Sequence, residues 1–161
     1  MRLLKISALI FVLFFLGCST RGLNTTTHHS KAPAYKTDNS TSQLLYQEYE
    51  KWQYTRYKYG GITFSGVDCS GLVQSVYKNT FNLKVPRTTR DQANAGYWIA
   101  KDDIQVGDLV LFKTGHNVRH SGIVIEDGKF LHSSTKRGVI ITNLDKPYYQ
   151  RTYWQARRVL R

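Results

Sequence analysis

The sequence has few cysteines, few acidic residues and no long apolar run. Only two of its 161 residues are Cys, at positions 18 and 69. The longest apolar stretch, residues 6–16, is too short to span a bilayer as a stable helix. No internal repeat is visible in the sequence. With 41% hydrophobic residues, the chain is still long enough for one domain whose core needs no disulfide bonds.

The apolar stretch belongs to a secretory signal peptide over residues 1–17. Arg2 and Lys5 supply the positive charge that precedes the apolar region, and Gly17 is the small residue that follows it. Cys18 stands directly after Gly17. A small residue followed by Cys at this place resembles the lipobox of bacterial lipoproteins, which implies cleavage before Cys18 and acylation of its thiol and amino group. An ordinary cleaved signal peptide is the alternative.

Acylation of Cys18 would make the protein a lipoprotein of the cell envelope that is attached to a membrane through its lipid. Several acyl chains anchor a protein firmly, because each buried methylene contributes about 0.8 kcal/mol. Ser19 rather than Asp follows Cys18. By analogy with such lipoproteins, this favours the outer membrane, with the domain facing the periplasm.

The shortage of acidic residues leaves 11 Asp and Glu against 23 Lys and Arg, a formal net charge of +12. Nucleic acid is the usual partner of so basic a chain, but export from the cytoplasm argues against it. Peptidoglycan stem peptides carry carboxylates and lie outside the cytoplasm, so they fit this charge better. The same excess of cations is also typical of an ordinary solvated surface.

Cys69 has no disulfide partner within the chain if Cys18 is acylated. It is then a lone thiol in an oxidising compartment, where an unpaired Cys usually has a function. The alternative interpretation is an inert thiol in the core.

Residues 18–41 combine the acylated Cys with a tether that is rich in Ser, Thr, Asn and Lys and has no apolar rhythm. Such a composition predicts a disordered segment. The folded domain is expected over residues 42–161. Its first helix is predicted by Leu45, Tyr49 and Trp52, which lie at helical spacing over about three turns.

A second helix is predicted to begin at Asp68, with Cys69 in its first turn. Leu72, Val73 and Val76 follow Cys69 by three, four and seven residues, so Cys69 lies in line with the buried face. Asp68 is a typical N-cap residue. The unpaired N–H groups and the dipole at a helix start stabilise a thiolate and are suited to hold an oxyanion.

The pattern changes from helical to strand-like in the second half of the domain. A short third helix over residues 88–95 is followed by β-rich runs at 108–112, 121–125, 129–133, 139–142 and 154–159. Asp127-Gly128 is a hairpin turn signal. Helices followed by strands indicate an α+β domain in which helices pack on an antiparallel sheet.

Three histidines fall within the domain, His116, His120 and His132. A nucleophilic thiol needs a base within hydrogen-bond reach, and the base needs an orienting partner. We predict His120 as the base and His132 as its partner, with His116 as the rival base. A simple two-residue turn would place His132 opposite Ile123 and turn His120 to the other face. The assignment therefore predicts a bulge or a turn of odd length, which Gly128 is suited to supply.

Five short motifs occur in a fixed order between residues 67 and 134. They are Val67-Asp68-Cys69-Ser70-Gly71-Leu72-Val73, Val85-Pro86-Arg87-Thr88, Val106-Gly107-Asp108-Leu109-Val110-Leu111-Phe112, Arg119-His120-Ser121-Gly122-Ile123 and Phe130-Leu131-His132-Ser133-Ser134. In these motifs the chain resembles the NlpC/p60 family of papain-like cell-wall peptidases, and within it the lipoprotein members. The resemblance covers roughly residues 45–161 and implies a papain-like α+β domain.

The resemblance implies Cys69 as the nucleophile, His120 as the base and His132 as the third, orienting residue. It also implies that Tyr57 lines the site near the oxyanion, although Tyr59 is a second candidate for that place. Ser121 departs from the Val that is common after the base, which we expect to alter packing and not the chemistry.

Asp68, Ser70 and Arg87 are further candidates for contact with the oxyanion or the substrate. Asp68 is expected to cap the helix and to contact a substrate amine. The bidentate guanidinium of Arg87 suits a substrate carboxylate, and a surface role is the alternative.

The resulting hypothesis is a cysteine endopeptidase that hydrolyses peptidoglycan stem peptides or crosslinks through an acyl-enzyme. The resemblance leaves two bonds open, D-alanyl–diaminopimelate and γ-D-glutamyl–diaminopimelate. A catalytically inactive peptidoglycan-binding lipoprotein and an acyltransferase of related fold are the alternatives. We expect no cofactor and no metal, since one Cys and the domain's His residues form no recognisable zinc motif. The sequence identifies no adaptor lipoprotein and no regulatory protease.

Overall fold

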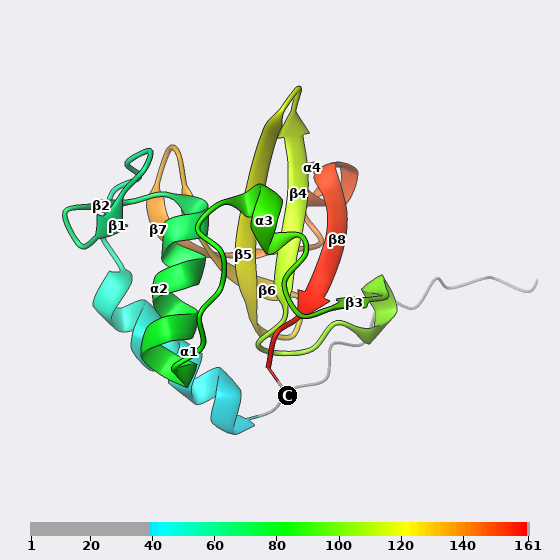
Figure 1. Cartoon of the computed structure of the whole chain (residues 1–161), viewed down its shortest axis with the longest axis horizontal. Helices are drawn as coiled ribbons and strands as arrows, with labels where there is room; N and C mark the ends of the chain where they lie inside the picture. Colours follow the sequence, from blue (N-terminus) through cyan, green and yellow to red (C-terminus); the bar gives the residue numbers. More distant parts are fainter. Residues whose placement is uncertain (1–38, 161) are drawn as a thin grey trace, which may run out of the picture. The chain divides into compact units, whose positions relative to one another are not determined.

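The computed structural model describes residues 39–160, which form an α+β domain (Figure 1). The helices are α1 (Asn39–Trp52), α2 (Cys69–Phe81), α3 (Thr89–Gln92) and α4 (Pro147–Thr152), with a 3₁₀ turn at Lys101–Asp103. The strands are β1 (Ile62–Thr63), β2 (Gly66–Val67), β3 (Tyr97–Ile99), β4 (Leu109–Gly115), β5 (Val118–Glu126), β6 (Lys129–Ser134), β7 (Gly138–Asn143) and β8 (Tyr153–Arg158). The predicted fold class is confirmed.

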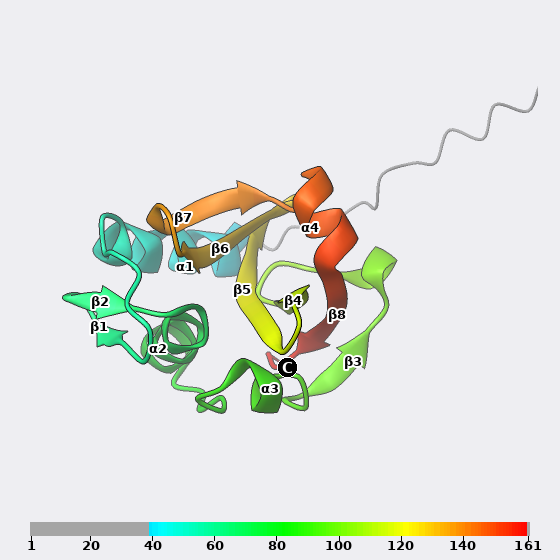
Figure 2. The same ribbon diagram turned by 90° about the horizontal axis from the view of Figure 1, so that it is seen from above.

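The strands β3 to β8 form one antiparallel sheet in the order β3-β8-β4-β5-β6-β7, and β1 pairs with β2 alone. Figure 2 shows the sheet curving, with α1 and α2 beside β5 and β6, and α4 near the ends of β7 and β8. Successive side chains of a strand point to opposite faces. Both faces of this sheet carry buried apolar side chains.

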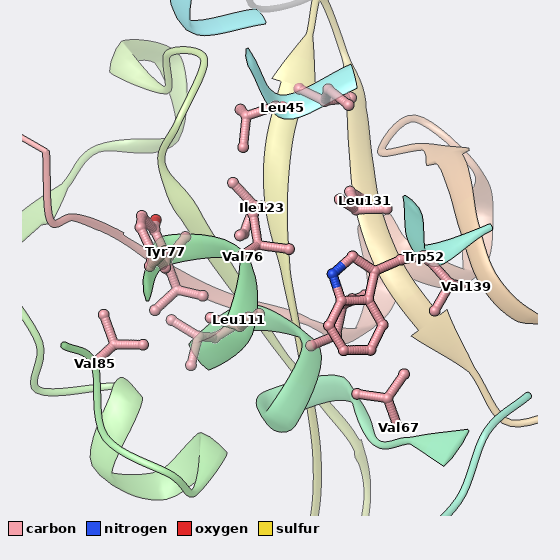
Figure 3. Close-up of a cluster of buried hydrophobic side chains, with 14 of the residues drawn as sticks. Leu45, Trp52, Val67, Val76, Tyr77, Val85, Leu111, Ile123, Leu131 and Val139 are labelled. Carbon is pink, nitrogen blue, oxygen red and sulfur yellow. The ribbon is translucent and has the colours of Figure 1, made fainter. Parts of the chain in front are cut away.

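One core cluster fills the space between the sheet and the helices α1 and α2. Leu45 and Trp52 of α1 and Val76 and Tyr77 of α2 belong to this cluster and are drawn in Figure 3. A second cluster lies on the other face of the sheet, where Phe112 and its neighbours pack against α4 and the loop that precedes it. Leu111 of β4 faces the first cluster and Phe112 faces the second, as strand alternation requires.

Helix α2 has a defined cap at each end. Asp68 is the N-cap, and its side chain accepts a hydrogen bond from the backbone N–H of Gly71. Asn82 closes the other end in the left-handed conformation, with φ of 53°. The buried face includes Leu72, Val73 and Val76, which confirms the predicted helix with Cys69 in its first turn. The helix begins at Cys69, one residue after the predicted start.

The hairpin between β5 and β6 contains the predicted irregularity. Glu126 pairs with Lys129 across a two-residue turn, whereas Val124 pairs with Phe130, so Ile125 is an extra residue on β5. The bulge is therefore at Ile125 and not at Gly128, which the sequence analysis favoured; Gly128 instead supplies a positive φ of 63° in the turn.

Some predictions concern residues outside the described part of the chain. The signal peptide over residues 1–17, Cys18 and the tether up to residue 38 belong to this group. Helix α1 begins at Asn39, before the predicted domain start at residue 42. Within residues 39–160, no helix has both the length and the apolar character that crossing a membrane requires.

Candidate active site

The thiol of Cys69 lies at the N-terminus of α2, and its residue is only 7% exposed. The first N–H groups of a helix have no intrahelical partner, and they point toward whatever lies at its N-terminus. The hydrogen-bond partner of the Cys69 sulfur in this structure is the Thr89 hydroxyl, at 3.8 Å. The sulfur thus lies beside both the free end of the helix and a hydroxyl group.

Asp68 and Arg87 form a clamp that fixes the loop before α2. Asp68 accepts hydrogen bonds from the backbone N–H of Gly71 at 2.7 Å and of Gly60 at 2.9 Å. Both terminal nitrogens of Arg87 donate to the Asp68 carboxylate, at 2.9 and 2.8 Å. Arg87 also donates to the Ser70 hydroxyl at 3.0 Å. The structure therefore gives Arg87 a partner within the protein, in addition to its place in the cleft lining.

The protonation of Asp68 follows from this clamp. Burial opposes the charged form of Asp68, but the hydrogen bonds from Arg87 and Gly71 outweigh it, so the pKa of Asp68 is lowered from its ordinary 3.8. Asp68 is accordingly a carboxylate at neutral pH, paired with a cation and not free to bind a substrate amine with both oxygens.

The structure brings His120 and His132 together, as the sequence predicted. Nε2 of His120 lies 2.8 Å from Nδ1 of His132, and the two rings are perpendicular. The bulge makes this contact possible, because it places His132 opposite Gly122, two residues from His120 on the same face. Gly122 is required there, since a Cβ at this position would lie 2.6 Å from the Leu131 carbonyl and 3.1 Å from the His132 Cβ.

Burial keeps both histidines neutral. Loss of hydration lowers the pKa of His120 from 6.5 to about 4. Burial, and then the neighbouring His120, lower the pKa of His132 well below its ordinary value. The His132 ring is 1% exposed and stacks on Phe130 at 4.6 Å between centroids.

Tyr149 of α4 contacts the second ring nitrogen of His132, and each direction of this hydrogen bond corresponds to one tautomer of the His120–His132 pair. Its hydroxyl lies 3.4 Å from Nε2 of His132. If the Nε2–H of His132 donates to Tyr149, Nδ1 of His132 accepts the Nε2–H of His120, and Nδ1 of His120 keeps its lone pair. The reverse arrangement puts a proton on Nδ1 of His120 and leaves no base. Only the first arrangement is compatible with proton abstraction.

Three candidates left open by the sequence are distinguished by where their side chains lie: Tyr57, Tyr59 and His116. Tyr57 lines both cavities of the cleft, and its pKa is raised by burial and by the nearby Cys69 and Asp68. Tyr59 is 89% exposed and lines only one of them. His116 is exposed and contacts Asn117, at 3.4 Å. Of the two tyrosines, Tyr57 is the better placed to contact a substrate beside Cys69. His116 lines neither cavity of the cleft.

The cleft consists of two adjoining cavities of about 1000 and 550 Å³. The residues that line both cavities are Tyr57, Cys69, Val118 and Arg119. The larger cavity is formed mainly by α3 and the loops around α2, and the smaller one contains both His120 and His132. Cys69 thus lies where the two halves of the cleft meet.

Sequence reasoning missed Thr89, Tyr149 and Arg119. Thr89 follows one of the five motifs and contacts the Cys69 sulfur. Tyr149 lies in α4, a helix that no apolar period marks and that begins at Pro147, a residue that a helix tolerates in its first turn. Arg119 stands next to the predicted base in the Arg119-His120 pair. Its adjacency to His120 was the one available signal.

The chemistry that this cleft offers is attack on a carbonyl carbon by a thiol, with a proton acceptor on one side and helix N–H groups on the other. Such an arrangement is typical of enzymes that transfer acyl groups, a class that includes the cysteine peptidases. Comparison with known proteins makes the class more specific.

The chain belongs to the NlpC/P60 family, whose model matches residues 54–158. It is 42% identical over 156 residues to the probable endopeptidase NlpC of Escherichia coli K12, covering 94% of this chain and 96% of that protein. It is 42% identical over 116 residues to murein DD-endopeptidase MepS/murein LD-carboxypeptidase of the same organism, covering 72% of this chain and 62% of that protein.

A solved structure agrees with these relatives. The crystal structure of an NlpC/P60 family protein from Bacillus cereus superimposes with a TM-score of 0.68 at 31% identity, covering 74% of this chain and 40% of that chain. The chain therefore spans less than half of that protein.

Proposed function

We propose that this protein is a cysteine endopeptidase that cuts the D-alanyl–diaminopimelate crosslink of peptidoglycan. The observation that carries the cysteine mechanism is the position of Cys69, which lies at the start of α2 and shares one cavity with the His120–His132 pair. The relatives named as endopeptidases support the reaction class and the peptidoglycan substrate.

The proposed reaction is acyl transfer to water. Nδ1 of His120 takes the proton of Cys69, and the thiolate attacks the substrate carbonyl carbon. N–H groups at the start of α2, together with the Tyr57 hydroxyl, hold the oxyanion. His120 then gives its proton to the leaving amine as the carbon–nitrogen bond breaks. A water molecule, deprotonated by His120, hydrolyses the thioester and regenerates the thiol.

The place of the leaving group follows from the place of the acid. His120 protonates the leaving amine, so that amine must lie in the cavity that His120 and His132 line. This cavity contains the cations Arg119 and Lys136, and among the described residues its lining includes no Asp or Glu. The larger cavity, in contrast, has acidic residues, Asp68 and Asp91, as well as arginines.

A cavity whose charged lining residues are the two cations Arg119, which it shares with the larger cavity, and Lys136 favours a leaving group that carries a carboxylate close to its amine. In the D-alanyl–diaminopimelate crosslink, the leaving nitrogen is bonded to a carbon that bears a free carboxylate. In the γ-D-glutamyl–diaminopimelate bond of a tetrapeptide stem, that carbon bears an amide, and the free carboxylate near the bond is on the acyl side. The charge distribution therefore favours the crosslink.

Arg119 is well suited to receive that carboxylate. Its guanidinium lies 5.6 Å from the centre of the Trp154 ring, which supports it from one side. Its Nε is buried without a hydrogen-bond partner in the structure. A substrate carboxylate would supply acceptors to this guanidinium.

Digestion of purified crosslinked muropeptides tests the proposal, with products identified by mass spectrometry. Wild-type protein should release monomers cut at D-alanyl–diaminopimelate, and the Cys69→Ala variant should release none. Equal products from both proteins would exclude Cys69 as the nucleophile and leave a wall-binding protein. A product in which the acyl group is joined to an added amine or lipid would instead indicate an acyltransferase.

The bond is tested with a dimer whose diaminopimelate carboxylate next to the scissile nitrogen is amidated. Amidation should lower kcat/KM by about tenfold for the wild type. The decrease should be smaller for Arg119→Gln and for Lys136→Met, because each variant already lacks one of the two cations that pair with this carboxylate. Lys113→Met is the matched control, since Lys113 also lies over Trp154, at 4.8 Å, but does not line the cleft. Cleavage only of γ-D-glutamyl bonds would refute the assignment.

The proposal includes the place of the enzyme in the cell. Lipid on Cys18 would hold it at the outer membrane, with the domain facing the periplasm and the peptidoglycan. Labelling cells with radioactive palmitate should mark the wild type and not Cys18→Ser. Fractionation on a density gradient should place the labelled protein with outer-membrane markers, and its recovery with inner-membrane markers would contradict that part of the proposal.

A further inference from the structure

Buried hydroxyl groups connect the thiol of Cys69 to strand β5. The Thr89 hydroxyl lies 3.8 Å from the Cys69 sulfur and 3.5 Å from the Ser121 hydroxyl. Ser121 in turn donates to Oε1 of Gln92 at 3.0 Å. Thr89, Ser121 and Gln92 are all buried. Thr89 is thus the link between the sulfur and a polar network in the interior.

At the far end of this network, the orientation of the Gln92 side-chain amide fixes the direction of the hydrogen bonds. Nε2 of Gln92 donates to the carbonyl of Ser70 at 3.0 Å and to that of Pro86 at 2.9 Å. An amide nitrogen held by two carbonyls leaves Oε1 of Gln92 as the acceptor end. The single proton of Ser121 is therefore committed to Gln92, and toward Thr89 the Ser121 oxygen is an acceptor only.

Thr89 is not needed to cap its own helix. The N-cap of α3 is Thr88, whose side chain accepts a hydrogen bond from the backbone N–H of Asp91. The proton of Thr89 consequently has two acceptors within reach, the Ser121 oxygen and the Cys69 sulfur. A hydroxyl turns about its C–O bond at little cost, so it can serve either one.

We propose that Thr89 is a catalytic residue whose hydroxyl changes its hydrogen-bond partner when Cys69 is ionised, with Ser121 as the positioning residue that receives the proton in the resting state. In the thiol state, Cys69 donates to Thr89 and Thr89 donates to Ser121. After His120 takes the thiol proton, the Thr89 hydroxyl turns and donates to the thiolate. No bond other than S–H is broken, and the proton ends on Nδ1 of His120.

This inference rests on the proposed role of Cys69, and it makes two predictions of opposite sign. Removing the Thr89 hydroxyl takes a donor from the thiolate, which makes ionisation harder. Removing the Ser121 hydroxyl takes the resting acceptor away from Thr89, which makes ionisation easier. A network that only packed the interior would not move the two titrations in opposite directions.

The test is the pH dependence of Cys69 alkylation by iodoacetamide in the full-length protein. The modified peptide is quantified by mass spectrometry, so that Cys18 does not contribute. Thr89→Val should raise the apparent pKa of the Cys69 thiol by about one unit and lower kcat/KM about tenfold. Ser121→Ala should lower that pKa by about half a unit. Thr89→Ser keeps the hydroxyl and should restore the titration to within about 0.3 units of the wild type.

The outcomes separate this inference from the proposed function. Alkylation needs no substrate, so it tests Thr89 even if muropeptide digestion excludes Cys69 as the nucleophile. An unchanged titration in Thr89→Val, a Thr89→Ser protein as impaired as Thr89→Val, or shifts of the same sign in Thr89→Val and Ser121→Ala would each overturn the inference. If Thr89→Val fails to fold, as judged by circular dichroism, the sign of the shift in Ser121→Ala decides alone.

Discussion

Replacing Arg87 with Met should destabilise the domain through the charge that it leaves behind on Asp68. The Asp68 carboxylate is 9% exposed, and both of its oxygens accept from Arg87. Breaking a buried ion pair from one side costs about 3–5 kcal/mol, because the remaining charge is desolvated and unpaired. The Arg87 side chain is 34% exposed, so water will replace part of the interaction. We therefore expect a loss of about 2 kcal/mol in the free energy of unfolding.

Urea unfolding followed by circular dichroism measures this loss, which corresponds to a decrease in Tm of about 8 °C for a domain of this size. Arg90→Met is the matched control. Arg90 lies three positions later on α3, is exposed and lines the same cavity, but it does not contact Asp68. Its replacement should change the free energy of unfolding by less than about 0.5 kcal/mol.

The pH dependence of stability provides a second test, because its sign follows from the pKa of Asp68. The pKa of Asp68 in the folded protein is lowered from 3.8, so its contribution to stability is complete above the unfolded value and is lost as the pH falls through the folded one. The deficit of Arg87→Met relative to wild type should therefore shrink below about pH 3.8. A deficit equal to that of Arg90→Met at pH 7, or one that persists after Asp68 is protonated, would refute the reasoning.

Three further predictions concern the catalytic cleft and its hairpin. Tyr149→Phe should lower kcat about tenfold with KM unchanged in muropeptide digestion, because the Nε2–H of His132 loses its acceptor in the tautomer that leaves Nδ1 of His120 free; an unchanged kcat would contradict that role. The acid limb of the kcat/KM profile should lie near pH 4 and not near 6.5, because His120 is protonated only as the pH falls through its pKa of about 4; initial rates across pH 3.5–8 measure it. Gly122→Ala should lower the free energy of unfolding by about 2 kcal/mol in urea titrations, whereas Gly115→Ala, whose Cβ would lie 3.5 Å from Val118, should cost about 1 kcal/mol or less.

The sequence predicted the parts of the site that rest on local rules. A capping Asp68 followed by apolar residues at helical spacing was enough to place Cys69 at the start of α2. The contact between His120 and His132 was predicted together with the irregularity that it requires. The position of the bulge was not predicted, since it depends on how Ile125 packs against residues from elsewhere in the chain.

The polar contacts between distant segments were not predictable in the same way. Thr89, Ser121 and Tyr149 meet their partners across 20, 29 and 17 residues respectively, and no local period marks such pairs. Short elements such as β3 and α4 also escaped prediction, because three to six residues are too few to show a repeating apolar pattern. Arg87 was expected either to bind a substrate carboxylate or to lie on the surface, and no local pattern marks Asp68 as the acceptor for both of its terminal nitrogens.

The extra residue at Ile125 has a consequence for how this enzyme can vary. Side chains alternate along a strand, so adding or removing one residue between Val124 and Lys129 would exchange the two surfaces of β6 and carry His132 away from His120. Changes of two residues would preserve the pairing. The length of this hairpin is therefore constrained in parity and not in size, and homologous hairpins should differ here by even numbers of residues wherever the histidine pair is retained.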